Sequence, residues 1–136
     1  MKKIIFPLVA LVCLLPGCAV VDAYLMTKYD PNEYKIVTDI RLVSEKAAVQ
    51  CEDANASKVN ANQLADKTRL FELYSQEIPR NKDNYAASHA LNEIAQGLAK
   101  KYNDGEKVSP LFCKLKFEGI RNSADVIRHV LANRPR

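Results

Sequence analysis

The side chains in this chain that could do chemistry are four cysteines and two histidines among 136 residues. Cys13 and Cys18 lie close together near the start, whereas Cys51 and Cys113 stand alone and far apart along the chain. None of the four belongs to a Cys-x-x-Cys motif, the spacing typical of redox-active thiols and of many thiolate metal sites. The spacing therefore argues against redox or metal chemistry by these thiols.

The histidines and carboxylates form no recognisable catalytic or metal-binding motif. His89 and Glu93 have the i, i+4 spacing of an ordinary helical pair, which is an incomplete metal site. His129 lies near the end of the last expected helix, where the helix dipole favours positive charge. Gly-x-Ser-x-Gly and glycine-rich phosphate-binding motifs are absent, and the chain has only four glycines. We therefore expect no enzyme activity, no metal ion and no cofactor.

The first fifteen residues have the pattern of an export signal. A basic start at residues 1–3 precedes an uncharged segment at residues 4–15, which is too short to span a bilayer as a helix. An uncleaved membrane helix over residues 4–21 is the alternative, although prolines would interrupt it. The pattern favours a signal peptide.

The signal ends in Leu15-Pro16-Gly17-Cys18, which resembles the lipobox of bacterial lipoproteins. The resemblance implies that residues 1–17 are a cleaved lipoprotein signal peptide and that Cys18 carries diacylglycerol and an N-acyl chain, such as palmitate. Several acyl chains on one residue make a stable membrane anchor. Ala19 follows Cys18 where lipoproteins of the inner membrane typically have Asp. The resemblance therefore implies the outer membrane, on its periplasmic face.

An exported domain lies in an oxidising compartment, so the cysteines that remain in the mature domain are expected to pair. Cys13 is discarded with the signal and Cys18 is lipidated, which leaves Cys51 and Cys113. A bridge between them would close a loop of 62 residues and join an early helix to the last region. The chain-entropy estimate for a loop of this size is about 4 kcal/mol.

Basic side chains gather in the C-terminal segment. Removal of residues 1–17 takes away two lysines and no acidic residue, so the net charge falls from +4 to +2, which argues against a nucleic-acid partner. The basic side chains that could face lipid phosphates or an acidic partner are Lys114, Lys116, Arg121 and Arg128. A solvated helix face is the simpler explanation of the same residues.

Helix-start signals place two helices in the first half of the mature chain. Asp30-Pro31 followed by Glu33 is typical of an N-cap, a proline in the first turn and a capping-box partner. The next start signal is Asn60, with a glutamine three residues later, and Pro79 ends that helix. Residues 55–57 are then expected to form the turn between the two helices.

The second half carries a clear amphipathic helix and an ambiguous last segment. Apolar residues recur every three or four positions from Ala87 to Tyr102, and Asn103-Asp104-Gly105 closes that helix. Residues 111–118 alternate in polarity, which fits either a strand or a short helix broken at Gly119. Since a lone strand has no partner, we expect the short helix, followed by a final helix that starts between Asn122 and Asp125.

These signals predict an all-α domain, a small bundle of four to five helices stapled by one disulfide. Residues 18–32 are expected to form the lipidated N-terminus and a tether, and residues 33–136 the helical periplasmic domain. A small helical lipoprotein with a bridge from an early helix to the last loosely resembles the pilotins of secretion systems. That resemblance implies a non-catalytic binding or assembly accessory for another envelope protein.

Two other classes of protein fit the same location. One is an envelope lipoprotein encoded by a phage or prophage, either an exclusion factor or a spanin-like subunit. Spanin subunits of this kind tend to be rich in proline, whereas this chain has six, two of them in the signal. The other class is a small hydrolase without a recognisable motif.

Overall fold

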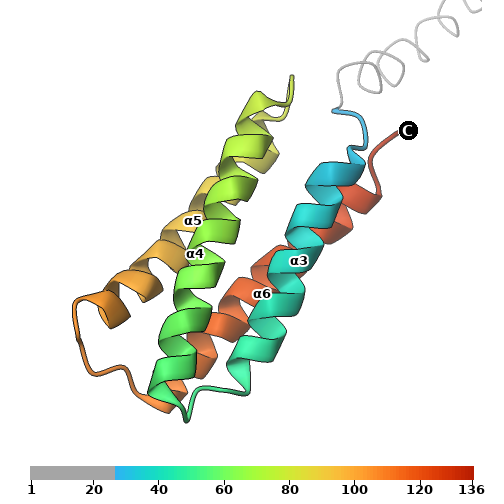
Figure 1. Ribbon diagram of the computed structural model, residues 1–136. Coiled ribbons are helices and arrows are strands. Elements are labelled where there is room, and N and C mark those ends of the chain that lie inside the picture. The colour runs from blue at the N-terminus through green and yellow to red at the C-terminus, as the bar shows by residue number, and fades with distance from the viewer. Residues whose placement is uncertain (1–26) are drawn as a thin grey trace, which may run out of the picture.

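The computed structural model describes residues 27–136, which form four α-helices joined by short connections (Figure 1). The helices are α3 (Pro31–Ala48), α4 (Ala54–Glu77), α5 (Lys82–Asn103) and α6 (Pro110–Ala132). No strand occurs within residues 27–136, so the predicted all-α fold is confirmed, with four helices. The expected signal peptide and Cys18 lie outside the described residues. In the part that is described, no helix is long and apolar enough to cross a membrane.

The helices run up and down, so that each is antiparallel to the next (Figure 1). α3 packs mainly on α6, α4 packs mainly on α5, and these two pairs together form the bundle. We call the end where α3 begins and α6 stops the terminal end. The opposite end holds the α3–α4 and α5–α6 connections, and we call it the disulfide end. Of the neighbouring helices, α5 and α6 contact each other least.

Each helix contributes an apolar stripe at helical spacing to one core. The buried residues of α6 are Cys113, Phe117, Ile120, Ala124, Ile127 and Leu131. This stripe passes Gly119 without a break, so the predicted interruption there is wrong. A glycine inside a helix costs about 1 kcal/mol, whereas each large apolar side chain contributes about 2 kcal/mol when it is buried. Burial along the whole stripe therefore keeps α6 continuous, and residues 111–118 are helical.

The start of α4 also differs from the prediction. Asp53, not Asn60, is the N-cap, and its carboxylate accepts hydrogen bonds from two backbone N–H groups of the first turn. Residues 55–57 therefore lie in the first turn of α4, and the prediction that they form a turn between helices is wrong. Both aspartate and asparagine are favourable caps, and the aspartate lies nearer to the end of α3.

Three other helix boundaries agree with the sequence. The carboxylate of Asp30 accepts two backbone N–H hydrogen bonds and caps α3, as expected. α4 ends just before Pro79, and Gly105 follows α5 with a φ of 75°, a left-handed conformation that glycine adopts readily. The first helical residue is Pro31, two positions inside the segment expected as a tether.

Candidate functional site

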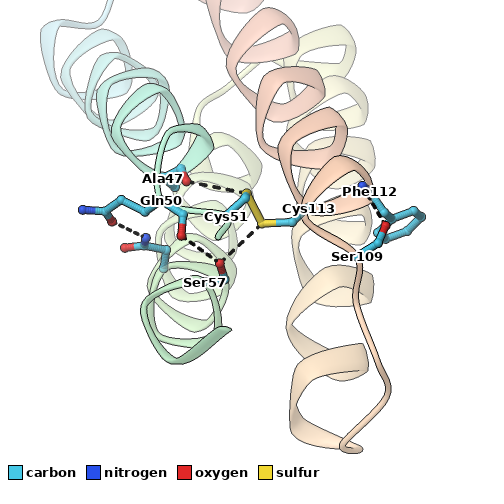
Figure 2. Close-up of a disulfide and its surroundings, with 8 residues drawn as sticks. Ala47, Gln50, Cys51, Ser57, Ser109, Phe112 and Cys113 are labelled. Carbon is cyan, nitrogen blue, oxygen red and sulfur yellow. Dashed lines mark hydrogen bonds between the residues drawn. A yellow bond between two sulfur atoms is a disulfide. The ribbon is translucent and has the colours of Figure 1, made fainter. Parts of the chain in front are cut away.

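At the disulfide end, a bond between Cys51 and Cys113 joins the connection after α3 to the beginning of α6 (Figure 2). The predicted pair is confirmed, and its Cα atoms lie 5.8 Å apart. Beside it, the Ser57 hydroxyl lies 3.5 Å from the Cys113 sulfur and donates a hydrogen bond to the Gln50 carbonyl at 3.3 Å. The beginning of α6 is therefore fixed to the α3–α4 connection and packed against the start of α4.

The same part of α6 carries exposed apolar and basic side chains on the face turned away from the core. Leu111 and Leu115, one turn apart, are 68% and 59% exposed. The Lys116 ammonium lies 5.3 Å from the ring centroid of the partly exposed Phe112, which is a cation–π contact. Lys114 is also exposed. We call this surface the α6 patch, and its residues are Leu111, Phe112, Lys114, Leu115 and Lys116.

The structure separates the four basic residues singled out in the sequence. The two lysines belong to the α6 patch, whereas the two arginines lie farther along α6. Arg121 donates hydrogen bonds to the side chain of Asn122. Arg128 donates to the Asp125 carboxylate and to the Tyr34 hydroxyl, each at 3.0 Å. Arg128 therefore ties α6 to α3, and the lysines are the better candidates for a contact with a partner.

At the terminal end, a buried carboxylate holds several elements together. Glu33 is fully buried near the start of α3. Its Oε2 accepts a hydrogen bond at 2.8 Å from Arg134, an arginine after α6 whose side chain is only 10% exposed. Its Oε1 accepts hydrogen bonds from Ser75 at 3.0 Å, from Asn81 at 2.6 Å and from Asn84. We call these five residues the Glu33 cluster, and they connect the two helix pairs.

The Glu33 cluster was missed because the sequence assigned Glu33 to a capping box. The side chain of Glu33 instead points into the interior, four residues before the buried Val37 and seven before the buried Ile40. A polar residue at a position that continues an apolar stripe is the signal that could have revealed it. Asn81, the N-cap residue of α5, makes no side-chain capping bond, because its amide serves Glu33.

An open groove of about 990 Å³ lies beside the Glu33 cluster, between the start of α5 and the end of α6. Its apolar wall includes Ala87 on α5 and Val126 and Val130 on α6, and the two valines are 65% and 55% exposed. Thr27, the first described residue, also lines this groove and donates a hydrogen bond to the Arg80 carbonyl at 2.6 Å. We call this feature the end groove.

A second buried carboxylate connects α4 with α5. Glu72 accepts a hydrogen bond from Asn92 at 2.6 Å and pairs with His89 Nδ1 at 2.6 Å and with Arg69 at 2.9 Å. Burial alone raises the pKa of Glu72, but the hydrogen bonds from His89, Arg69 and Asn92 together hold it below its ordinary value. The hydrogen bond to Glu72 in turn raises the pKa of His89. The expected partner Glu93 is farther from His89, at 3.8 Å, so this histidine mainly joins two helices.

We expect the contribution of His89 to stability to depend on pH. Since the folded-state pKa of His89 is raised, this contribution is fully present when the pH is below the ordinary imidazole pKa. It is lost as the pH rises through the raised pKa. The folded-state pKa of Glu72 is lowered, so its contribution to stability is present when the pH is above the ordinary carboxyl pKa. This contribution is lost as the pH falls through the lowered pKa. The difference in the free energy of unfolding between wild type and His89→Gln, measured with urea, should therefore be larger at about pH 5.5 than at about pH 9.

Glu93→Gln is the matched control for His89→Gln. Glu93 is the more distant and more exposed partner of the same histidine, so its replacement should change the free energy of unfolding little at either pH. If the difference in the free energy of unfolding between wild type and His89→Gln stays constant or grows from acid to alkaline pH, the ion pair between His89 and Glu72 is contradicted.

The geometry of the described residues offers surfaces for binding. Within residues 27–136, no group of three or more His, Cys, Asp or Glu side chains is arranged to hold a metal ion. Two of these surfaces are the α6 patch at the disulfide end and the end groove at the terminal end. Comparison of the chain with protein-family models, with curated proteins and with solved structures finds no match.

Proposed function

We propose that this protein is a lipid-anchored, non-catalytic accessory of the bacterial envelope that binds another envelope protein through the α6 patch. The observation that carries the proposal is the exposure of Leu111 and Leu115 on α6, beside the exposed side chains of Lys114 and Lys116. Large apolar side chains clustered on a surface favour a protein contact. The lipid anchor is Cys18, on the basis of the lipobox resemblance, and the location is the periplasmic face of the outer membrane.

The positions of the anchor and the patch support this proposal. Thr27 lies at the terminal end and is only nine residues after Cys18. α6 begins at the disulfide end and has 23 residues, which span about 34 Å at the helical rise (Figure 1). A bundle tethered at its terminal end would therefore hold the α6 patch away from the membrane, where a periplasmic partner can reach it.

The disulfide also supports a binding role for the α6 patch. Cys113 lies between the patch residues Phe112 and Lys114, so the bridge to Cys51 fixes the backbone that carries the patch. A surface that is already ordered loses less conformational entropy on binding than a flexible one. The patch is therefore prepared for association without rearrangement.

The chemistry of the patch indicates the kind of partner. Leucines in the centre of an interface provide apolar contact, and lysines at its edge favour acidic groups on the other side. An amphipathic helix with an apolar stripe and acidic flanks meets both requirements. We propose such a segment of an envelope protein as the partner.

A photo-cross-linking amino acid at position 115 of the full chain tests this function in cells. We expect one discrete cross-linked envelope protein, and we expect Lys114→Glu with Lys116→Glu to reduce its yield by at least about tenfold, as loss of attraction and added repulsion weaken the contact. Val59 provides the matched control position, because it is 66% exposed on α4 and lies outside the patch.

No cross-link at position 115, or equal cross-linking at positions 115 and 59, would contradict a specific surface. The identity of the captured protein also separates the classes of function. A secretion-system component would support the pilotin-like reading, whereas a phage-encoded protein would support an exclusion or spanin-like lipoprotein.

A further inference from the structure

We propose that the α6 patch of one copy of this chain binds the outer face of α4 on a second copy. That face carries Asp66, Leu70, Leu73 and Glu77, and we call it the α4 surface. The proposal goes beyond the proposed function, because it concerns a second surface and a contact between two copies of this chain. Only its effect on the binding of the envelope partner rests on the proposed function.

The α4 surface presents two leucines between two acidic side chains. Leu70 and Leu73 lie one turn apart and are 55% and 44% exposed. Asp66 lies one turn before the first leucine, and Glu77 lies one turn after the second, so all four side chains follow one face of the helix. Both acidic side chains are exposed. The α4 surface therefore combines apolar contact area with an acidic residue at each end.

The charges of the α4 surface and of the α6 patch are complementary, and neither set is used within its own copy. Within residues 27–136, Asp66 and Glu77 belong to no ion pair. The same is true of Lys114 and Lys116 in that part of the chain. Arg69, which precedes the leucines of α4, pairs with a buried carboxylate at 2.9 Å. Each surface therefore keeps a charge that the other can neutralise.

The spacing of these charges fits a steep crossing of α4 over α6. Lys114 and Lys116 stand on opposite sides of Leu115, because two residues turn a helix through about 200°. Asp66 and Glu77 instead follow each other along α4, and their separation of 11 positions corresponds to about 16 Å. A steep crossing therefore places one acidic residue near each lysine and brings the leucines of the two copies together.

The two surfaces of one copy cannot meet, so the contact requires a second copy. α4 and α6 each pack on α3 and α5 and lie diagonally across the bundle from each other (Figure 1). The α6 patch lies at the disulfide end, whereas Leu73 is four positions before the last residue of α4, at the terminal end. Contact between two unlike surfaces is head-to-tail, so each copy keeps one surface unoccupied and further copies can join.

Copies anchored in one membrane can also form this contact, a consequence that rests on the proposed lipidation of Cys18. The α6 patch lies farther from the terminal end than the α4 surface by about 14 helical residues, or about 20 Å. The nine residues from Cys18 to Thr27 span at most about 32 Å. One copy can therefore stand higher than its neighbour by the distance that the contact requires.

Self-association would compete with the envelope partner for the α6 patch. The α4 surface has the apolar stripe and the acidic residues that we propose for that partner, so both contacts use Lys114 and Lys116. A second copy would cover the patch until the partner displaces it, which would limit contact with other acidic proteins.

Cysteine cross-linking between two differently tagged full-length copies tests the contact in cells. One copy carries Leu73→Cys and the other carries Leu115→Cys, and we expect a disulfide-linked product that contains both tags. As the matched control, Val59→Cys replaces Leu73→Cys, because position 59 is exposed on α4 outside the α4 surface. The control should give at least about tenfold less product. Equal amounts of product from positions 59 and 73 would overturn the inference.

Charge reversal followed by rescue tests the complementarity. Asp66→Lys with Glu77→Lys in the Leu73→Cys copy should reduce the linked product at least about tenfold. Adding Lys114→Glu with Lys116→Glu to the other copy should restore the product to within about threefold of its original amount. An unchanged amount after the first reversal, or no recovery after the second, would contradict the contact.

Glu45→Lys with Glu93→Lys is the matched control for the first reversal. These two acidic residues are 51% and 71% exposed and lie on α3 and α5, outside both surfaces. Their replacement changes the net charge by the same amount, so it should leave the linked product nearly unchanged. An equal loss of product in this control would show that only net charge matters and would overturn the inference.

Photo-cross-linking separates this inference from the proposed function. With a cross-linker at position 115, Asp66→Lys with Glu77→Lys should abolish capture of a second copy and retain capture of the envelope partner, because the α6 patch is unchanged. Capture of this chain alone at position 115 would support the inference and contradict the proposed partner. A cross-linker at position 73 that captures another protein in place of this chain would overturn the inference.

Discussion

Replacing Arg134 by alanine is expected to lower the free energy of unfolding by about 3–5 kcal/mol, as measured by urea unfolding. Arg134 donates to the Glu33 carboxylate at 2.8 Å and to the side-chain amide oxygen of Asn81 at 2.7 Å. Its loss would leave a fully buried carboxylate without its opposite charge. The three neutral donors that remain would satisfy hydrogen bonds to Glu33 but would not neutralise its charge.

Arg128→Ala is the matched control, because this arginine also lies near the end of α6 but pairs with Asp125 at a partly exposed site. Exposed ion pairs typically contribute about 1 kcal/mol or less, so its replacement should have a much smaller effect. Adding Glu33→Gln to Arg134→Ala should recover part of the loss, since it removes the buried charge. If Arg134→Ala is no more destabilising than Arg128→Ala, the Glu33 cluster does not hold the terminal end.

Replacing both Cys51 and Cys113 by alanine is expected to cost about 4 kcal/mol of unfolding free energy. The bridge joins residues separated by 62 positions, so its removal frees a long loop in the unfolded chain. Domains of this size are typically stable by only about 5–15 kcal/mol, which makes this loss a large fraction of the total. Urea unfolding of the double variant beside wild type measures it.

Reduction of the wild-type protein provides the control for the cysteine replacements. Reduced wild type should lose nearly as much stability as the double variant, because both lack the same constraint on the unfolded chain. Mass spectrometry of the non-reduced protein should show one peptide pair linked through Cys51 and Cys113. Two free thiols there, or a loss below about 1 kcal/mol in the double variant, would contradict the role of the bridge.

Local signals in the sequence were enough to predict most helix boundaries. Asp30, Pro79 and Gly105 act on the backbone within a few residues, so their effect can be recognised from the sequence. The predictions at Asn60 and Gly119 were wrong because both treated a local preference as decisive. The buried stripe of α6 outweighs the helix cost of Gly119, and this burial depends on the other three helices.

The candidate sites were only partly predictable for the same reason. The Cys51–Cys113 pair followed from the number of cysteines left after the proposed anchor. The lysines of the α6 patch were recognised, but the exposed leucines beside them were read as alternation in polarity. The Glu33 cluster depends on a contact between Glu33 and Arg134, which are 101 positions apart. Such a pair becomes visible only when the helices are packed.

The most direct test of an anchored envelope protein is metabolic labelling of the full chain with palmitate in bacterial cells. Wild type should incorporate the label and sediment with the outer membrane, because Cys18 would carry the acyl chains. Cys18→Ser should remain unlabelled, whereas the matched control Cys13→Ser should be labelled like wild type. Label that persists in Cys18→Ser, or wild type that takes up none, would contradict the lipid anchor and with it the proposed function.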